Sequence, residues 1–295
     1  MANLKEVRIR IASVSSTQQI TKAMKMVSAA KLKRATNAII QLRPYANKLQ
    51  EILKNLSASL EDGVSAYTQE REVKNVLLVV ITSNRGLAGA FNTNVLKTAN
   101  NLIAEKYDTY RQSGNLQIIA IGKKAQDYYE KREYKVIGNN NDLFSELNFE
   151  NVSAITEAIM QGFVEGKYDK VEVVYNQFKN AAVQLLTVEQ LLPVPKAERV
   201  EEDSTSSNVD YILEPSKEEI VENLIPKNIK LQLYKAVLDS HAAEHGARMT
   251  AMDKATDNAG ELLKALKLSY NQARQAAITT ELSEIVSGAA ALSNG

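Results

Sequence analysis

The sequence predicts a long antiparallel two-helix coiled coil, formed by both ends of the chain, together with a doubly wound α/β domain between them. Three observations lead to this fold class. Heptad-spaced apolar residues run through 4–56, continuous apolar segments alternate with helical patterns over 75–195, and no proline occurs in 227–292. A lone helix cannot bury its own apolar stripe, so the economical arrangement packs the two terminal helices on each other.

The N-terminal coiled-coil helix is expected over residues 2–60. Apolar residues recur at alternating steps of three and four, without any glycine, which is typical of a coiled-coil seam. Pro44 lies inside this run, and because the pattern continues past it, a bend rather than a stop is expected.

The seam of this helix changes character between Val14 and Leu32. Polar residues take its positions there, namely Gln18, Thr21, Lys25 and Ser28. The apolar residues of the same stretch lie on a shifted stripe made of Ile20, Met24 and Val27. This shift predicts a local change of supercoil or of packing partner.

The central α/β domain is expected over residues 75–195. Buried strands are predicted at 75–83, 117–121 and 170–175, with a further strand at 183–192, and helices are predicted at 89–111, 123–132 and 151–166. Alternation of apolar strands with helices is typical of a mostly parallel, doubly wound (Rossmann-like) sheet that is covered on both faces.

The C-terminal helical region, expected over 216–292, completes the coiled coil. Ser216-Lys-Glu-Glu219 has the pattern of a capping box and predicts a short helix. Pro226 is expected to restart the chain, and one helix is predicted from Lys227 to about Leu292. The polar segment 199–208 before it is expected to be an exposed loop.

The composition excludes several classes of protein. The 295-residue chain has no cysteine, which rules out disulfides and thiolate metal sites. Its longest apolar run, Val76 to Ile81, is far shorter than the roughly 18 residues of a membrane span. The first residues contain no apolar segment typical of a secretory signal. Membrane association is therefore expected only through partners.

Positive charge is concentrated at the N-terminus, although the formal net charge of the whole chain is only +1. Residues 2–59 contain eleven Lys or Arg and only two acidic residues. Nucleic-acid binding usually adds stacking aromatic residues, but Tyr45 is the only aromatic residue there. A solvated helix face, which normally mixes both signs, remains an open interpretation, and nucleic acid is not expected. A third interpretation, in which this basic side meets acidic loops of a protein partner, is implied only by the family resemblance given below.

Two further motifs could carry chemistry, and structural interpretations are favoured for both. His241-Ala-Ala-Glu-His245 has the spacing of an inverted zinc-peptidase motif, but a zinc site needs a third ligand. Gly86-Leu-Ala-Gly89 follows a strand and opens a helix, as phosphate-binding loops do, yet it lacks the G-x-G-x-x-G pattern and no Gly-Lys-Ser or Gly-Lys-Thr occurs. No metal, nucleotide or other cofactor is expected, and no catalytic residue is assigned.

Four segments, in order along nearly the whole chain, resemble the gamma subunit of the F-type ATP synthase of bacterial type. They are Ile20-Thr-Lys-Ala-Met-Lys-Met-Val-Ser-Ala-Ala-Lys-Leu32 with Arg43-Pro-Tyr-Ala46, Thr82-Ser-Asn-Arg-Gly-Leu-Ala-Gly-Ala-Phe-Asn92, Glu244-His-Gly-Ala-Arg-Met-Thr-Ala-Met-Asp-Lys-Ala-Thr-Asp-Asn-Ala259, and the stretch from Tyr270-Asn-Gln-Ala-Arg-Gln-Ala to Leu292. Asn84 and Ala88 stand where that family has Asp and Cys, and Gln272 stands where it often has a basic residue.

The resemblance implies a non-catalytic central rotor shaft that couples rotation of a membrane c-ring, driven by protons or sodium ions, to ATP synthesis or hydrolysis. The implied partners are a ring of three alpha and three beta subunits, an epsilon subunit and the c-ring, at the cytoplasmic face of the bacterial inner membrane. The implied contacts with the alpha/beta ring are Met24, Lys25, Arg248, Arg274, Gln275, Thr279 and Glu281. A non-rotary coiled-coil adaptor and a nucleotide-binding α/β enzyme remain the alternatives.

Overall fold

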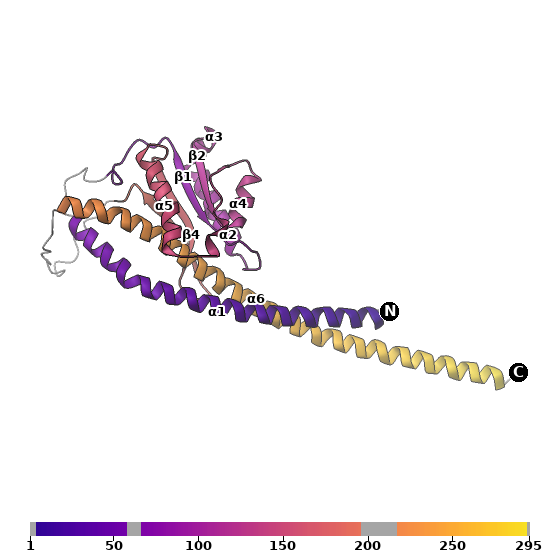
Figure 1. Ribbon diagram of the computed structural model, residues 1–295. Helices are drawn as coiled ribbons and strands as arrows, with labels where there is room; N and C mark the ends of the chain where they lie inside the picture. The colour runs from indigo at the N-terminus through magenta and orange to yellow at the C-terminus, as the bar shows by residue number, and fades with distance from the viewer. Residues whose placement is uncertain (1–3, 58–65, 196–216, 294–295) are drawn as a thin grey trace. The chain divides into compact units, whose positions relative to one another are not determined.

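A computed structural model describes residues 4–57, 66–195 and 217–293 of the chain (Figure 1). These residues form two compact units. The two-helix unit contains the N-terminal helix up to Ser28 and the C-terminal helix from Arg248, and the α/β unit covers 29–247. Two long helices contribute to both units: α1 spans Leu4–Ser57 and α6 spans Lys217–Ser293.

The α/β unit contains a five-stranded sheet in the order β3-β2-β1-β4-β5. The strands are β1 (Val76–Ile81), β2 (Leu116–Ile121), β3 (Lys135–Val136), β4 (Lys170–Phe178) and β5 (Gln184–Leu192). β1 pairs in parallel with β2 and β4, β2 pairs in parallel with β3, and β5 is antiparallel to β4. The expected mostly parallel, doubly wound sheet is confirmed, and β3 is an addition that the sequence pattern was too short to reveal.

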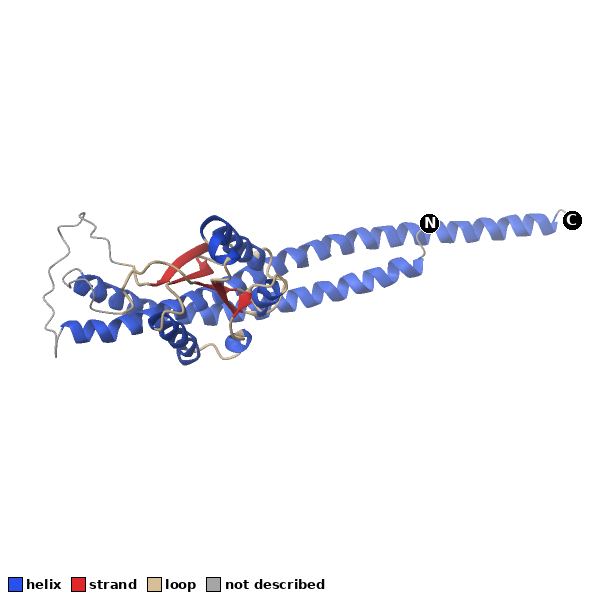
Figure 2. Ribbon diagram, turned by 90° about the horizontal axis from the view of Figure 1, so that it is seen from above, coloured by secondary structure: helices blue, strands red, loops and turns tan. Residues whose placement is uncertain are grey.

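Helices cover both faces of the sheet (Figures 1 and 2). Besides α1 and α6, they are α2 (Phe91–Lys106), α3 (Asp108–Gln112), α4 (Lys123–Glu130), the 3₁₀ turn η1 (Asn141–Phe144) and α5 (Phe149–Val164). The side chains of β1 alternate between two cores, as the pleat of a strand requires. Leu77 and Val79 join a core with α5, α1 and α6, whereas Leu78 and Val80 join a core with α2 and α4.

The terminal helices pack antiparallel, as the seam pattern predicts. In the α/β unit Ala35 and Ile39 of α1 share a core with Leu238 and Ala242 of α6. In the two-helix unit Thr21 of α1 contacts Thr256 of α6. As the α1 residue number rises, that of its neighbour on α6 falls, which defines the antiparallel direction in each unit.

Both helices continue through proline. Pro44 lies inside α1, so the expected absence of a stop there is confirmed. Pro226 lies inside α6, so the expected short helix followed by a restart is wrong. Proline removes one backbone hydrogen bond of a helix, and here the buried neighbours Ile225 and Ile229 hold this part of α6 in the core. Ser216 and the expected loop 199–208 lie outside the described residues.

Within the described ranges, none of the helices is both long enough and apolar enough to cross a bilayer.

Candidate functional site: the surface of a helical shaft

The crevice in which doubly wound sheets usually bind ligands is filled by the protein's own C-terminal helix. Such ligands bind beyond the carboxyl ends of the strands, where the strand order reverses, which here is between β1 and β4. Ala88 and Phe91 follow β1 and pack with Ala243 of α6, while Phe178, the last residue of β4, packs against the same cluster. A side-chain core of α6 therefore occupies the position that a nucleotide would need.

The polar groups at the end of β1 bond to one another and to the next helix. Ser83 is engaged within this loop: its N–H donates to Asn92 Oδ1 at 2.9 Å, and its hydroxyl donates to the Arg85 carbonyl at 2.7 Å and accepts from Asn92 Nδ2 at 2.8 Å. Thr82 Oγ1 accepts from the N–H of Ala125 at 2.9 Å, inside the first turn of α4. The N–H groups of Lys123 and Lys124 at the same helix N-terminus donate to Asn84 Oδ1 and to the Ser83 carbonyl, so these groups are already engaged and cannot cradle a phosphate.

Asn84 and Ala88, which depart from the family pattern, both have a structural role in this loop. Asn84 Oδ1 accepts from the N–H of Lys123 at 2.9 Å, and Asn84 Nδ2 donates to the Asn141 carbonyl at 2.7 Å. An aspartate could make the first bond but not the second, since an ionised carboxylate only accepts. Ala88 is 1% exposed, and its small side chain fits against α6.

The two histidines contact each other. His241 Nε2 and His245 Nε2 lie 3.1 Å apart, so one imidazole donates to the other. The His241 ring also stacks on Phe144. Burial, with a smaller contribution from Lys31, lowers the pKa of His241 to about 4, so the ring is neutral at physiological pH. No group of three or more potential metal ligands occurs among the described residues.

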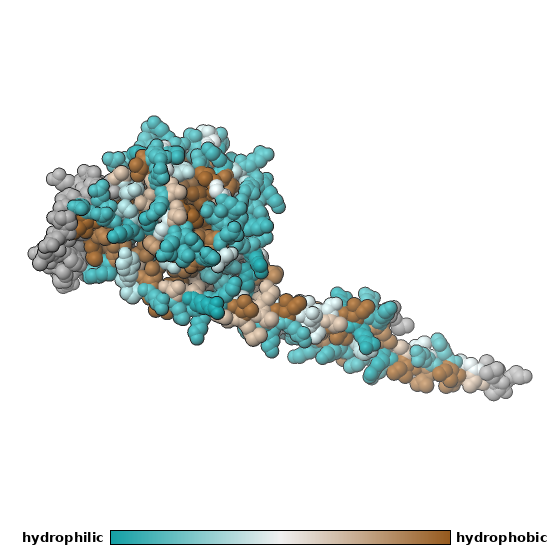
Figure 3. Space-filling model, viewed as in Figure 1, coloured by the Kyte–Doolittle hydropathy of each residue, from teal (hydrophilic) through white to brown (hydrophobic). Residues whose placement is uncertain are grey.

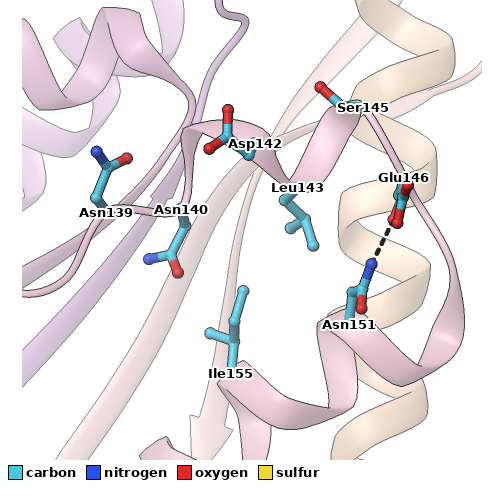
Figure 4. A pocket seen from close by; sticks show the side chains of 8 residues that line it. All are labelled: Asn139, Asn140, Asp142, Leu143, Ser145, Glu146, Asn151 and Ile155. Carbon is cyan, nitrogen blue, oxygen red and sulfur yellow. Dashed lines mark hydrogen bonds between the residues drawn. The ribbon is translucent and has the colours of Figure 1, made fainter.

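A polar cleft of about 440 Å³ lies between η1 and the start of α5 (Figure 4). Asn139, Asp142 and Glu146 are among its lining residues, and no Lys or Arg lines it. Asn151 Nδ2 donates to the Glu146 carbonyl at 2.8 Å across one end of the cleft. Its side chains are spread along the rim rather than directed at one point, so it offers no converging set of catalytic groups.

The polar stretch of α1 remains on the seam. Thr21 is 9% exposed and Ser28 is 2% exposed, whereas Ile20 and Val27 of the shifted stripe are 56% and 59% exposed. The expected change of packing partner is therefore wrong for the seam itself, because the same register continues to face α6. Polar contacts replace the apolar ones: Thr256 Oγ1 donates to Thr21 Oγ1 at 2.8 Å, and Lys25 Nζ pairs with Asp253 Oδ1 at 2.5 Å.

An open groove of about 500 Å³ runs beside this polar stretch. Lys22 and Lys25 line it from α1, and Asp253 and Asp257 line it from α6. Met26, which is 61% exposed, also lines it. The groove therefore presents both signs of charge next to an exposed apolar side chain.

The C-terminal part of α6 extends beyond any partner in α1. Thr21 faces Thr256, so counting back along an antiparallel pair in heptad steps brings the start of α1 opposite about residue 273. Apolar side chains are exposed beyond that point, at Ile278, Leu282, Ile285 and Val286, between 50% and 67%. Brown apolar surface appears near the end of this helix in Figure 3.

The seven residues that resemble family contact positions lie in three settings. Arg274, Gln275, Thr279 and Glu281 are exposed on the C-terminal part of α6. Met24 is half-buried, and the Lys25 side chain is 41% exposed while it pairs with Asp253. Arg248 is only 8% exposed. Lys25 of α1 thus lies next to Asp253 of α6, about three heptads before the four exposed residues at 274–281. Arg248 is buried.

Leu87 is a residue that the sequence interpretation did not single out. It is 66% exposed and has a φ of 65°, in the left-handed region that branched and bulky residues rarely adopt. It lies in the loop after β1, in which Ala88 is buried and Arg85 is exposed. The only signal in the sequence was a large apolar residue between two glycines.

These features define a class of protein that acts through the surface of a two-helix shaft joined to an α/β domain whose usual ligand crevice is filled. Residues 3–292 match the family described as ATP synthase. The chain is 56% identical to the ATP synthase gamma chain of Cytophaga hutchinsonii, over 100% of both chains, and 59% identical to that of Flavobacterium johnsoniae, over 99% of both. The chain belongs to the ATP synthase gamma-chain family.

Solved structures agree with this family. The chain is similar to a chain of the Euglena gracilis mitochondrial ATP synthase rotor, with a TM-score of 0.65 and 26% identity over 93% of this chain and 98% of that one. A second Euglena gracilis ATP synthase structure shares the fold, with a TM-score of 0.70 at 23% identity. The gamma chain is a non-catalytic subunit of that enzyme, whose catalytic sites lie in the beta subunits.

Proposed function

We propose that this chain is the central rotor shaft of an ATP synthase. It couples ion-driven rotation of a membrane c-ring to conformational cycling of the catalytic beta subunits, in ATP synthesis and, in reverse, in hydrolysis. Membership of the gamma-chain family supports this proposal. The observation in the structure that supports it most directly is the length of α6 beyond residue 273, which exposes Ile278, Leu282 and Ile285 with no partner in α1.

The exposed end of α6 suits rotation inside a sleeve. Small side chains dominate it, since Ala, Ser, Thr and Gly make up most of residues 269–295. A slender helix on which bulky side chains are few and scattered can pack against a ring of subunits and still turn. The proposed ring consists of three alpha and three beta subunits.

The mechanism needs no catalytic group on this chain. A shaft made of two different helices presents a different face to each of three equivalent beta subunits. Each face stabilises one beta conformation over the others, and a difference in contact free energy becomes a difference in nucleotide affinity. Rotation moves every beta subunit through the same sequence of states.

We propose that Met24, Lys25, Arg248, Arg274, Gln275, Thr279 and Glu281 contact the alpha/beta ring. The four exposed residues of α6 are available for direct contact. Lys25 already pairs with Asp253, so a contact with a beta carboxylate would have to share or replace that pair. Arg248 is almost buried, and we expect its substitution to act mainly through the fold of the chain.

The α/β unit is the proposed seat of the remaining partners, an epsilon subunit and the c-ring. The exposed Leu87 loop is one candidate contact, because a strained residue at an exposed tip often serves a function. The chain is a peripheral component of the complex, and we place it at the cytoplasmic face of a bacterial inner membrane. Bacterial relatives over the full length support that placement.

The alternative of a nucleotide-binding enzyme is disfavoured by the filled crevice between β1 and β4. A non-rotary coiled-coil adaptor would use the same two helices without alpha and beta subunits. The two alternatives predict different results for the isolated chain, namely ATP binding in a calorimetric titration for the enzyme and stable self-association for the adaptor.

Co-expression with the cognate alpha and beta subunits tests the proposal. The chain carries an affinity tag, and the purified material is analysed for stoichiometry and ATP hydrolysis. One copy of this chain with three copies of each partner, and steady turnover, supports the rotor. A folded chain that purifies alone, from cells in which alpha and beta are both soluble, contradicts it.

A further inference from the structure

The two-helix unit contains a layer of polar residues where a coiled coil would ordinarily have apolar ones. On α1 the layer consists of Gln18, Thr21 and Lys25, and on α6 it consists of Asp253 and Thr256. Every member is bonded across the pair: Thr256 Oγ1 donates to Thr21 Oγ1 at 2.8 Å, Gln18 Nε2 donates to the Thr256 carbonyl at 3.4 Å, and Lys25 Nζ pairs with Asp253 Oδ1 at 2.5 Å.

Stability alone does not explain this layer. The Lys25 and Asp253 side chains are 41% and 48% exposed, and an ion pair so accessible to water contributes only about 0.2–1 kcal/mol. Apolar side chains were available as an alternative, because Ile20 and Val27 of the same helix are left exposed. The layer keeps polar groups on the seam while apolar groups face outward, which indicates a role other than burial.

Register is what a polar layer can specify. Apolar seam residues such as Val7, Ile11 and Val14 pack against most apolar partners, so they discriminate poorly between registers that differ by one heptad. A slide of one heptad, seven residues, would place Lys25 opposite Gly260 and Thr21 opposite Leu263. The ammonium group would then lose its carboxylate, and the threonine hydroxyl would lose its partner on α6.

The observed register also places a glycine next to the Gln18 side chain. A β-carbon at Gly260 would come 3.0 Å from Gln18 Nε2, so the absence of a side chain at 260 leaves space for the Gln18 amide. Ordinary seam residues on both sides of the layer, Met252 and Ala259, are 4% and 8% exposed. The layer is therefore flanked by packed side chains on α6 and is not a frayed part of the interface, although its ion pair reaches water.

We propose that Gln18, Thr21, Lys25, Asp253 and Thr256 are positioning residues that set the register between the two helices of the shaft. Through that register they fix the position, along the axis of the helix pair, of the exposed Ile20 and Val27 of α1 relative to Arg274 and Glu281 of α6. This inference rests on the proposed rotor function, since a shaft that presents each face at a defined height must hold its helices in one register.

Disulfide trapping can read the register directly, because the chain has no native cysteine. Thr21 faces Thr256, so one heptad further along the antiparallel pair Val14 faces Leu263. The in-register probe is therefore Val14→Cys with Leu263→Cys. The probe for a one-heptad slide is Val14→Cys with Tyr270→Cys. Disulfide formation requires β-carbons about 3.5–4.5 Å apart, so each pair reports a single register.

Both probes are introduced into the full chain with its native layer and into an apolar-layer variant in which four of the five members become leucine: Thr21→Leu, Lys25→Leu, Asp253→Leu and Thr256→Leu. With the native layer we expect only the in-register disulfide. With the apolar layer we expect the slid disulfide to increase at least about tenfold, since polar seam residues are what separate such registers. In the chain that otherwise keeps its native layer, Lys25→Asp alone should lower the yield of the in-register disulfide. Adding Asp253→Lys restores the charge pair with its signs exchanged and should return that yield.

A milder variant keeps the test decisive if the fourfold substitution does not fold. Thr256→Val keeps the shape of threonine and replaces only its hydroxyl with a methyl group, and it should raise the slid disulfide while leaving the unfolding midpoint unchanged. Retention of a single register in a folded apolar-layer variant, or in Thr256→Val, overturns the inference. Assembly with alpha and beta subunits is measured separately on the native layer, so failure of the rotor proposal and failure of the register proposal are distinguishable.

Discussion

Gly246 of α6 lies directly against the backbone of Ala181 in the turn between β4 and β5. A β-carbon at 246 would come 3.1 Å from the Ala181 carbonyl oxygen and 3.2 Å from its Cα. Helix and turn approach so closely only because residue 246 has no side chain. Together with Ala243 and Ala247, which pack on Phe178 and Phe91, this contact seats the helix on the carboxyl ends of the sheet.

Gly246→Ala should therefore destabilise the chain, although alanine is the better helix former. The helix gains about 1 kcal/mol from the propensity of alanine, but the turn backbone must move, and overpacking of this kind costs typically about 1–3 kcal/mol. We expect a net loss of stability and a lower unfolding midpoint in urea.

Gly288→Ala is the matched control for that measurement. A β-carbon at 288 meets nothing within 4 Å, so only the helix propensity changes. The control should leave the midpoint unchanged or slightly higher. An unchanged midpoint for Gly246→Ala would show that the turn can yield and that this seat is not tight.

Leu87→Gly should stabilise the isolated chain. Leu87 has a φ of 65°, and glycine avoids the cost of about 1 kcal/mol that other residues incur in this conformation. Its side chain is 66% exposed, so little packing is lost. If the loop contacts a partner, as proposed, the same variant should also bind the epsilon subunit or the c-ring more weakly. Leu87→Ala retains the strain and controls for loss of the side chain. A destabilised Leu87→Gly chain would contradict the strain argument.

His241 should make the stability of the α/β unit depend on pH. Its pKa is lowered from 6.5 to about 4 by burial and by Lys31, so the folded chain holds the ring neutral while the unfolded chain takes up a proton below pH 6.5. The unfolded state binds more protons in that window, and stability must fall as the pH drops from about 6.5 to 4. The loss attributable to His241 is on the order of 3 kcal/mol.

The comparison with His241→Gln isolates this contribution. Urea unfolding is measured for both chains at pH 7.5 and at pH 5. The native chain should lose more stability on acidification than the variant, because glutamine does not titrate. Equal losses would mean that His241 is as easily protonated in the folded chain as in the unfolded one.

Removal of residues 278–295 should have little effect on the isolated chain. The described residues of that segment are exposed and lie beyond the end of α1, so truncation removes few buried contacts and should shift the free energy of unfolding by less than about 0.5 kcal/mol. In the complex the same truncation should lower the yield of assembled enzyme. A large loss of stability in the isolated chain would show that the segment packs on the chain itself and not on a sleeve.

Periodicity was sufficient to predict both long helices and the main strands, because burial imposes a period of seven on a coiled coil and continuous apolar runs on a parallel sheet. Periodicity did not predict how the chain behaves at Pro226, because a proline can end a helix or lie inside one. Pro226 was expected to end a helix, but its neighbours Ile225 and Ile229 are buried in the core and α6 continues. The two-residue strand β3 is too short to leave a pattern.

The candidate site was less predictable, because its key contacts join residues far apart in the sequence. Lys25 was recognised as a family position, but its partner was not. Asp253 lies 228 positions further along the chain, and predicting the pair requires knowing the register between α1 and α6. The shifted stripe of Ile20, Met24 and Val27 predicted a local change of supercoil or of packing partner in α1. The structure shows instead that Thr21 and Ser28 stay buried on the seam. A polar seam and an unpartnered face look alike in a sequence.

Rotation of this chain within the assembled complex tests the central claim most directly. Thr109 is exposed on α3, and Thr109→Cys gives this cysteine-free chain a single attachment point. A probe that can be followed by light microscopy is attached there, and the alpha and beta subunits are fixed to a surface. On addition of ATP, the account predicts rotation in one direction with three stopping positions in each turn. A complex that hydrolyses ATP steadily while the probe on this chain stays still would contradict it.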